Sequence, residues 1–357
     1  MKFLRFPTPT CPTKGRFLTL VLLLLGVSGW GQVPRISKAA IHVTVRQMAD
    51  TLARHYVFVE KRQPYRKEML ARLKSGRYDT LSSWPSFRQY LTKEMREISR
   101  DKHLYLLYNP APEPQPQPGT DRRSPEEIDR ASEAQAAKNN FGFERVEIMP
   151  GNVGYLKLSE INLFYQGSIA ALQAAAAFLQ HTDALVIDLR DNGGGGDDIG
   201  PVFVSWFLKK ETPLLGFKTP TTKIISYGRT MNILPVERRL DTPLYILINR
   251  HTGSAAEAYS YMLQNHKRAI IVGEPSAGAA NASEEYPITP FLRMSVSVAA
   301  PVSFVTHTNW EMVGVQPDRP CDPAKALPEA HLMALRRLAD ANAELRPLLQ
   351  SLETKNN

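Results

Sequence analysis

Cysteine is scarce in this sequence. Only two cysteines occur in 357 residues, and Cys11 precedes the first apolar run, which leaves Cys321 alone in the body of the chain. A single cysteine can form neither an intrachain disulfide nor a cysteine cluster for a metal. We therefore expect a fold whose stability depends on its hydrophobic core.

Long hydrophobic segments are also missing. The run FLTLVLLLLGVSGW, residues 17–30, is shorter than the roughly 20 apolar residues that cross a membrane. Basic residues precede it and small residues follow it, which predicts a secretory signal peptide over residues 1–31, with cleavage after Gly31. The mature protein is then expected in the periplasm or outside the cell, without stable membrane insertion. A retained signal anchor is the alternative.

The sequence has no arginine- or lysine-rich stripe with interleaved aromatic residues. Its formal net charge is +9, which becomes +5 (9 − 4) when the four basic residues of the leader are removed. This mildly basic balance gives no reason to expect a nucleic-acid partner. The content of 43% hydrophobic and 22% charged residues is typical of a globular protein.

Residues 38–108 predict a small N-terminal helical bundle. Ile41, Val45, Met48 and Leu52 recur at three- and four-residue spacing, which is the pattern of an amphipathic helix. A proline-rich polar stretch follows, and it predicts a linker with a short helix over residues 109–140.

Residues 141–322 predict an α/β core. The apolar segments ALVID, LYILI and AIIVG alternate with helical segments, a pattern typical of layered α/β domains with a largely parallel sheet. Two strand-like segments flank Pro-Gly-Asn, which predicts a hairpin, and the later segment LRMSVSVAAPVSFV predicts antiparallel strands. Residues 323–357 predict a C-terminal helical tail.

One of the apolar strands runs into four glycines, in VIDLRDNGGGGDDIGP. A phosphate-binding loop would need a lysine and a hydroxyl residue that are missing, and the spacing of a dinucleotide fingerprint is absent. A calcium loop would have to draw on Asp191 and Asp197 without any supporting repeat. Two interpretations remain: an oxyanion hole made of backbone N–H groups, or a tight turn from strand to helix.

Ser254 also has two interpretations. Ser254 and Glu257 spell S-x-x-E, the pattern of a helix capping box. A serine at a helix start could instead be a nucleophile, because free N–H groups there favour negative charge and the Ala255 amide could hold an oxyanion. Taken alone, the capping interpretation is favoured.

Four motifs occur in order along the chain, namely DLRDNGGG, TGSAAEA, VGEPSAGAANASE and NWEMVGVQPD. Together they resemble the tail-specific or C-terminal processing peptidase family over residues 38–322. The resemblance implies a crotonase-like or ClpP-like α/β core with a mixed sheet behind a helical bundle. It also implies Ser254 as a serine nucleophile, Ala255 and Gly194 as oxyanion-hole donors, and no metal or organic cofactor.

The sequence departs from the processing proteases at their catalytic lysine. In those enzymes the motif is G-E-x-T-x-G-K-G, whereas here GEPSAGAAN places Ala279 at the lysine position, which excludes a Ser-Lys dyad there. His103, in DKHLYL, and Glu311, before G-V-x-P-D, resemble the branch that contains the tricorn core protease and interphotoreceptor retinoid-binding protein.

That branch implies a serine peptidase in which His103 takes the proton of Ser254 and Glu311 supports the imidazole. The expected substrate is a peptide or an unfolded protein. The alternative is a catalytically silent protein that binds a small apolar ligand.

Overall fold

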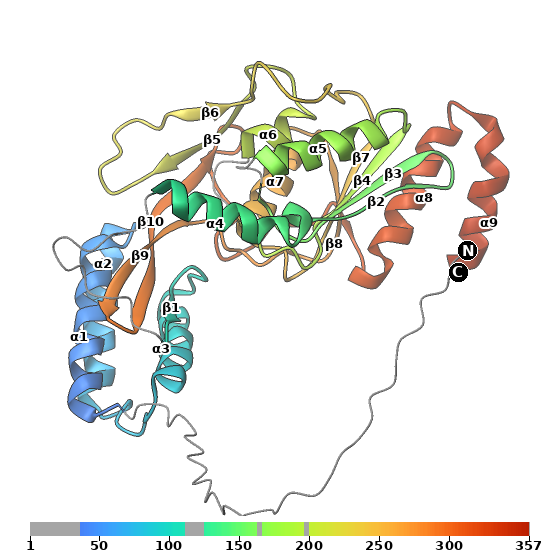
Figure 1. The fold of residues 1–357 in the computed structure, drawn as a ribbon. Coiled ribbons are helices and arrows are strands. Elements are labelled where there is room, and N and C mark those ends of the chain that lie inside the picture. Colours follow the sequence, from blue (N-terminus) through green and yellow to red (C-terminus); the bar gives the residue numbers. More distant parts are fainter. Residues whose placement is uncertain (1–35, 111–124, 163–165, 196–199, 357) are drawn as a thin grey trace, which may run out of the picture. The chain divides into compact units, whose positions relative to one another are not determined.

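The computed structural model describes residues 36–110, 125–162, 166–195 and 200–356 (Figure 1). The expected signal peptide with its cleavage site and most of the proline-rich stretch fall outside these ranges. Residues 35–357 form one compact unit. In the described ranges, no helix has both the length and the apolar character needed to span a membrane.

The first described elements are helical, as predicted. Helix α1 begins after Ser37, whose hydroxyl accepts a hydrogen bond from the Ala40 N–H, and the predicted apolar stripe on α1 is buried. Helix α3 begins after Ser83, with Pro85 in its first turn. The bounds are α1 Lys38–His55, α2 Val59–Lys74 and α3 Trp84–Ser99.

A six-stranded sheet forms the centre of the core, in the order β11-β8-β7-β4-β3-β2. All neighbouring pairs are parallel except β2–β3, which form the predicted hairpin around Gly151. The strands are β2 Phe143–Met149, β3 Val153–Leu158, β4 Ala184–Asp188, β7 Leu244–Ile248, β8 Ile270–Gly273 and β11 Arg319–Pro320.

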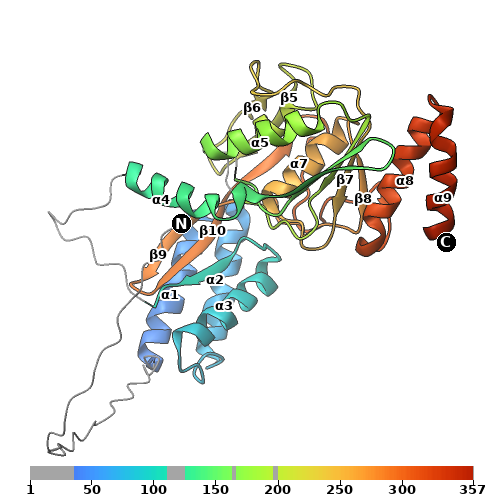
Figure 2. The ribbon, with the colours of Figure 1, turned by 45° about the vertical axis from the view of Figure 1, so that its right-hand side comes forward.

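Helices cover both faces of this sheet, which explains why its central strands are largely apolar. Leu185 and Ile187 belong to the hydrophobic cluster that includes residues of α5, α6 and α7, whereas Ala184 and Val186 belong to the cluster that includes α8. Helix α9 packs beside α8 (Figure 2). The bounds are α4 Pro125–Ala137, α5 Gln166–Leu179, α6 Gly200–Ser205, α7 Ser254–Asn265, α8 Ala326–Ala339 and α9 Arg346–Asn356.

A second sheet has the order β1-β10-β5-β6, and β9 also pairs with β10. Strand β10 is antiparallel to its partners, as predicted for this segment. Ile288, Leu292 and Met294 of the β9–β10 hairpin pack into the core of the N-terminal helices. The bounds are β1 Tyr105–Tyr108, β5 Pro213–Lys218, β6 Tyr227–Arg229, β9 Ala282–Thr289 and β10 Leu292–Ser303.

The fold therefore confirms the predicted class: an α/β core with a mixed sheet, helices before it and helices after it. One feature could not be read from local patterns. The N-terminal helices share their core with β9 and β10, and β1 joins the same sheet as β10.

Candidate active site

Ser254 is the first residue of helix α7 and has a left-handed backbone with φ of 50°. Such a conformation is unusual for a residue other than glycine and is found where the surroundings impose it, often at functional sites. Gly253 is the N-cap residue, and it has no side chain that could cap the helix. The Ser254 hydroxyl has no hydrogen-bond partner in the described parts of the chain, so it remains available for chemistry.

The capping-box interpretation holds only for Glu257. Its carboxylate accepts the Ser254 N–H at 2.9 Å, as the glutamate of a capping box would. The same carboxylate also accepts the Ser276 hydroxyl at 2.5 Å and the N–H groups of Gly278 and Ala279 at 2.6 and 2.9 Å. Glu257 is fully buried. It therefore joins the first turn of α7 to the loop that carries Ala279.

The glycine loop is fastened to the turn before Ser254. The Gly253 N–H donates to the Asn192 carbonyl at 2.9 Å, and the Thr252 hydroxyl donates to the Leu189 carbonyl at 2.7 Å. The Asn249 side chain donates to Asp191 Oδ1 at 2.8 Å. These bonds hold the ends of β4 and β7 together, at the carboxyl edge where parallel sheets place their sites.

Gly194 lies against Ser254. A Cβ atom on Gly194 would lie 2.8 Å from the Ser254 Cβ and 3.0 Å from the Ala255 nitrogen. The Ala255 N–H has no acceptor among the described residues, as an oxyanion donor would require. The Gly194 N–H, however, donates to Asn192 Oδ1 at 2.9 Å. A role for Gly194 as a second donor thus requires this bond to open.

We expect Gly194→Ala to abolish reaction of Ser254 with a fluorophosphonate. The added methyl group would collide with Ser254 and Ala255, and the φ of 102° is strained for alanine. Labelling followed by intact-mass spectrometry measures the effect. Gly193→Ala is the matched control, because a Cβ there meets no atom within 4 Å. Equal labelling of both variants would contradict the assignment.

Glu311 lies beside the segment Ala279–Asn281. Its Oε2 accepts the N–H groups of Ala280 and Asn281 at 2.7 and 3.1 Å. Burial, together with the nearby carboxylate of Asp101, raises the pKa of Glu311 to about 7. The Glu311 carboxyl can therefore exchange a proton near neutral pH, and the two N–H groups that it accepts directly follow Ala279.

Asp101 connects His103 to this segment, a role that the sequence did not suggest. Its Oδ1 accepts the His103 backbone N–H at 2.9 Å, and its Oδ2 accepts the Asn281 side-chain amide at 3.0 Å. The Tyr56 hydroxyl also donates to Oδ2, at 3.2 Å. Asp101 is only 1% exposed. The only available cue was a carboxylate two residues before the candidate base.

A pocket of 290 Å³ opens beside Ser254. Ala280 and Asn281 line this pocket together with Ser254. Glu311 accepts the Ala280 N–H and Asp101 accepts the Asn281 side-chain amide, so both carboxylates are hydrogen-bonded to residues of the pocket wall. Apolar side chains from β5, α7 and the loop before Glu311 form much of the rest, including Leu214, Leu215, Phe217, Met262 and Trp310. In the described residues, no group of three or more histidine, cysteine or carboxylate side chains could hold a metal ion.

Comparison with known proteins identifies the family. The profile of peptidase family S41 matches residues 152–321, and the profile of the N-terminal domain of peptidase S41 in eukaryotic IRBP matches residues 35–148. The chain belongs to peptidase family S41. This result confirms the resemblance that the four ordered motifs indicated.

Curated relatives include carboxyl-terminal-processing peptidase 2, chloroplastic, from Arabidopsis thaliana, which is 29% identical over 170 residues, 47% of this chain and 32% of the relative. The carboxyl-terminal-processing protease of Synechocystis is 29% identical over 171 residues, 47% of this chain and 38% of the relative. The similarity thus spans about a third of the length of these relatives. A solved Parabacteroides merdae structure shares the fold, with a TM-score of 0.53, 17% identity and coverage of 80% of this chain and 90% of the other.

Proposed function

We propose that this protein is a serine peptidase. Ser254 attacks a peptide carbonyl, His103 receives the serine proton and passes it to the leaving amine, and the Ala255 N–H stabilises the oxyanion. Gly194 supplies a second donor once its bond to Asn192 opens. Glu311 and Asp101 hold the segments around the site, and the reaction uses no metal and no organic cofactor.

The proposal rests on the backbone conformation, the hydrogen bonding and the position of Ser254. Its backbone is left-handed, its hydroxyl takes no part in capping, and it lines a pocket beside an unpaired backbone N–H. A serine that only began a helix would use its hydroxyl as the cap acceptor, as Ser37 does in α1. The geometry therefore supports a reactive serine.

The base must differ from that of the lysine-dependent relatives. Ala279 occupies the lysine position and its backbone N–H is bonded to Glu257. The segment that ends in His103 is joined to the pocket wall through Asp101 and Asn281. These contacts favour His103 as the base, and they make Asp101 a positioning residue.

The proposed substrate is a peptide or an unfolded protein, which enters the 290 Å³ pocket next to Ser254 with an apolar side chain. The proposed location is the periplasm or the outside of the cell, after removal of residues 1–31. Incubation of the purified protein with casein and with a fluorophosphonate tests the activity. Mass spectrometry of the secreted chain tests the cleavage site, and an N-terminus before residue 32 would contradict it.

A second candidate is a binding protein for a small apolar ligand, because the pocket wall is largely apolar and an IRBP domain profile matches residues 35–148. Titration with fatty acids and retinoids tests it. Binding of such a ligand by a protein that neither cleaves casein nor reacts with the fluorophosphonate would replace the peptidase proposal.

Glu311 predicts a pH dependence of stability. Because its pKa rises from the ordinary 4.5 to about 7, the folded state retains a proton that the unfolded state has released between these pH values. The free energy of unfolding contributed by this group therefore falls as pH rises from about 4.5 to about 7. We expect Glu311→Gln to remove this pH-dependent contribution. The free energy of unfolding of the variant, relative to that of the wild type, should therefore increase between about pH 4.5 and about pH 7. Urea denaturation at pH 5, 6, 7 and 8 measures it, and a constant difference would refute the assignment.

A further inference from the structure

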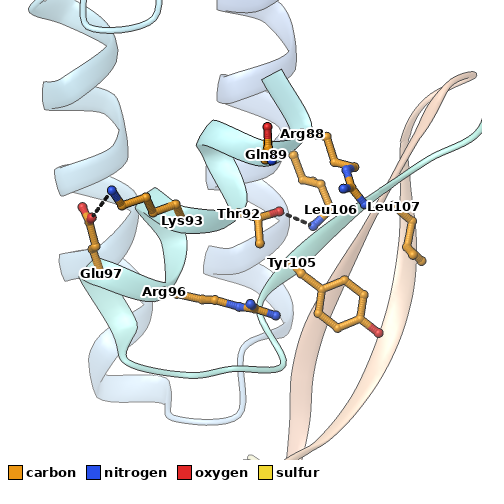
Figure 3. Close-up of a pocket in the computed structure, with 9 residues that line it drawn as sticks. All are labelled: Arg88, Gln89, Thr92, Lys93, Arg96, Glu97, Tyr105, Leu106 and Leu107. Carbon is orange, nitrogen blue, oxygen red and sulfur yellow. Dashed lines mark hydrogen bonds and ion pairs between the residues drawn. The ribbon is translucent and has the colours of Figure 1, made fainter. Parts of the chain in front are cut away.

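A second, larger hollow lies away from Ser254, between helix α3 and strand β1 (Figure 3). Its volume is 730 Å³, within the range of ligand pockets. Figure 3 shows Arg96 and Tyr105 at one end of this groove and Arg88 and Leu107 at the other. We call it the α3–β1 groove.

The α3–β1 groove is basic. Arg88, Lys93 and Arg96 line it with a single carboxylate, Glu97, so its net charge is +2 (3 − 1). Glu97 lies 3.8 Å from Lys93, in an exposed pair that contributes little. Arg88 has no ion-pair partner among the described residues. The Arg96 guanidinium donates to the Lys102 carbonyl at 2.8 Å and lies over the Tyr105 ring. The guanidinium of Arg88 and the remaining N–H groups of Arg96 are available for an anionic ligand.

The opposite wall of the groove is an edge strand with an apolar surface. Among the described residues, strand β1 pairs with β10 on one side only, and Tyr105 and Leu107 line the groove. On the free edge, the Leu106 N–H already donates to the Thr92 hydroxyl of α3 at 3.0 Å. An added strand cannot pair at that position, so recognition must depend on side chains.

The spacing of the cations fits an extended chain. Arg88 and Arg96 are eight residues apart on one helix, about 12 Å along its axis. In an extended peptide, side chains on one face at positions i and i+4 lie about 13 Å apart. Two carboxylates with this spacing can meet both arginines, while intervening apolar side chains contact Tyr105 and Leu107.

We propose that the α3–β1 groove binds an acidic, extended segment of polypeptide. The groove is separate from the pocket at Ser254, and this inference does not require Ser254 to be a nucleophile. Strand β1 begins two residues after His103. An acidic polypeptide bound in the groove is thus held next to the segment that carries the candidate base.

Fluorescence anisotropy of a labelled peptide tests the proposal. The probe alternates glutamate and valine, and a second peptide has glutamine in place of glutamate. The full chain carries Ser254→Ala so that no cleavage can occur. We expect saturable binding of the glutamate peptide that weakens with salt, and at least about tenfold weaker binding of the glutamine peptide.

The matched variants are Arg88→Glu with Arg96→Glu, and Arg46→Glu with Arg54→Glu. The second pair reverses two exposed arginines with the same eight-residue spacing on α1, so the net charge of both proteins is identical. We expect the groove variant to lose at least about tenfold in affinity and the control to change less than about twofold. Arg88→Glu alone, which breaks no contact of Arg96, should show part of the loss.

Three results would overturn the proposal: no binding of the glutamate peptide, equal weakening in both double variants, or preference for a single-stranded oligonucleotide. Fluorophosphonate labelling of the groove variant with Ser254 intact separates the two proposals. In that variant, retained labelling with lost peptide binding supports the groove, whereas a wild-type chain that binds the glutamate peptide but is not labelled counts only against the active-site assignment.

Discussion

Ser254→Ala is expected to abolish fluorophosphonate labelling and to reduce peptide hydrolysis by about 10⁶-fold, the order of loss that follows removal of a catalytic serine. The hydroxyl is the attacking group, and water cannot replace it in forming an acyl intermediate. Because that hydroxyl makes no bond to other described residues, its removal should leave the free energy of unfolding almost unchanged. Loss of activity without loss of stability distinguishes a nucleophile from a cap.

The controls for this prediction lie nearby in the chain. Ser283→Ala removes an exposed hydroxyl from β9 and should keep full activity. His103→Ala should reproduce the loss seen in Ser254→Ala, whereas His251→Ala, at an exposed position three residues before Ser254, should not. If His251→Ala were inactive and His103→Ala active, the base would have been assigned to the wrong histidine.

Glu257→Ala is expected to lower the free energy of unfolding by about 3 kcal/mol and to reduce labelling of Ser254. The substitution leaves four donors, from Ser254, Ser276, Gly278 and Ala279, without their common acceptor. Each buried donor without a partner costs on the order of 1 kcal/mol or more. Without the Glu257 carboxylate, the first turn of α7 is no longer bonded to residues 276–279. Ser254 is then held less firmly, which explains the expected reduction in labelling.

Glu274→Ala is the matched control, because this glutamate follows β8 directly and, within the described ranges, its side chain accepts only the Arg250 N–H, at 3.1 Å. We expect its cost to be below about 1 kcal/mol. Urea denaturation measures both variants, and labelling is compared at a temperature where both remain folded. Similar stability losses would show that the hydrogen bonds of Glu257 do not support the fold.

Local patterns predicted the parts of this fold that depend on neighbouring residues. The parallel strands were recognisable because both faces of the sheet are covered, which makes β7 and the part of β4 before Asp188 apolar. The position of Ser254 after a strand and before a helix followed from the same alternation. The family resemblance, not periodicity, suggested His103 and Glu311.

The remaining features depend on contacts between distant residues, which a single sequence does not display. Asp101 and Asn281 are 180 positions apart, and nothing in either local sequence indicates their hydrogen bond. Asn192 was visible only as part of a glycine-rich loop, yet its side chain accepts the Gly194 N–H and donates to the Leu158 carbonyl. The match of Glu257 to a capping box predicted only its bond to the Ser254 N–H, and not the other three hydrogen bonds that its carboxylate accepts.

Strand β10 has a consequence for how the chain reaches its folded state. Its first residues complete the core of the N-terminal helices, while Ala300–Ser303 pair with β5 and Pro301 lines the pocket at Ser254. During synthesis the three leading helices emerge long before the residues that cover them. Contacts of such large sequence separation form slowly. We therefore expect the apolar surface of the N-terminal helices to stay exposed until residues 282–303 have been synthesised. A fragment that ends before these residues should aggregate.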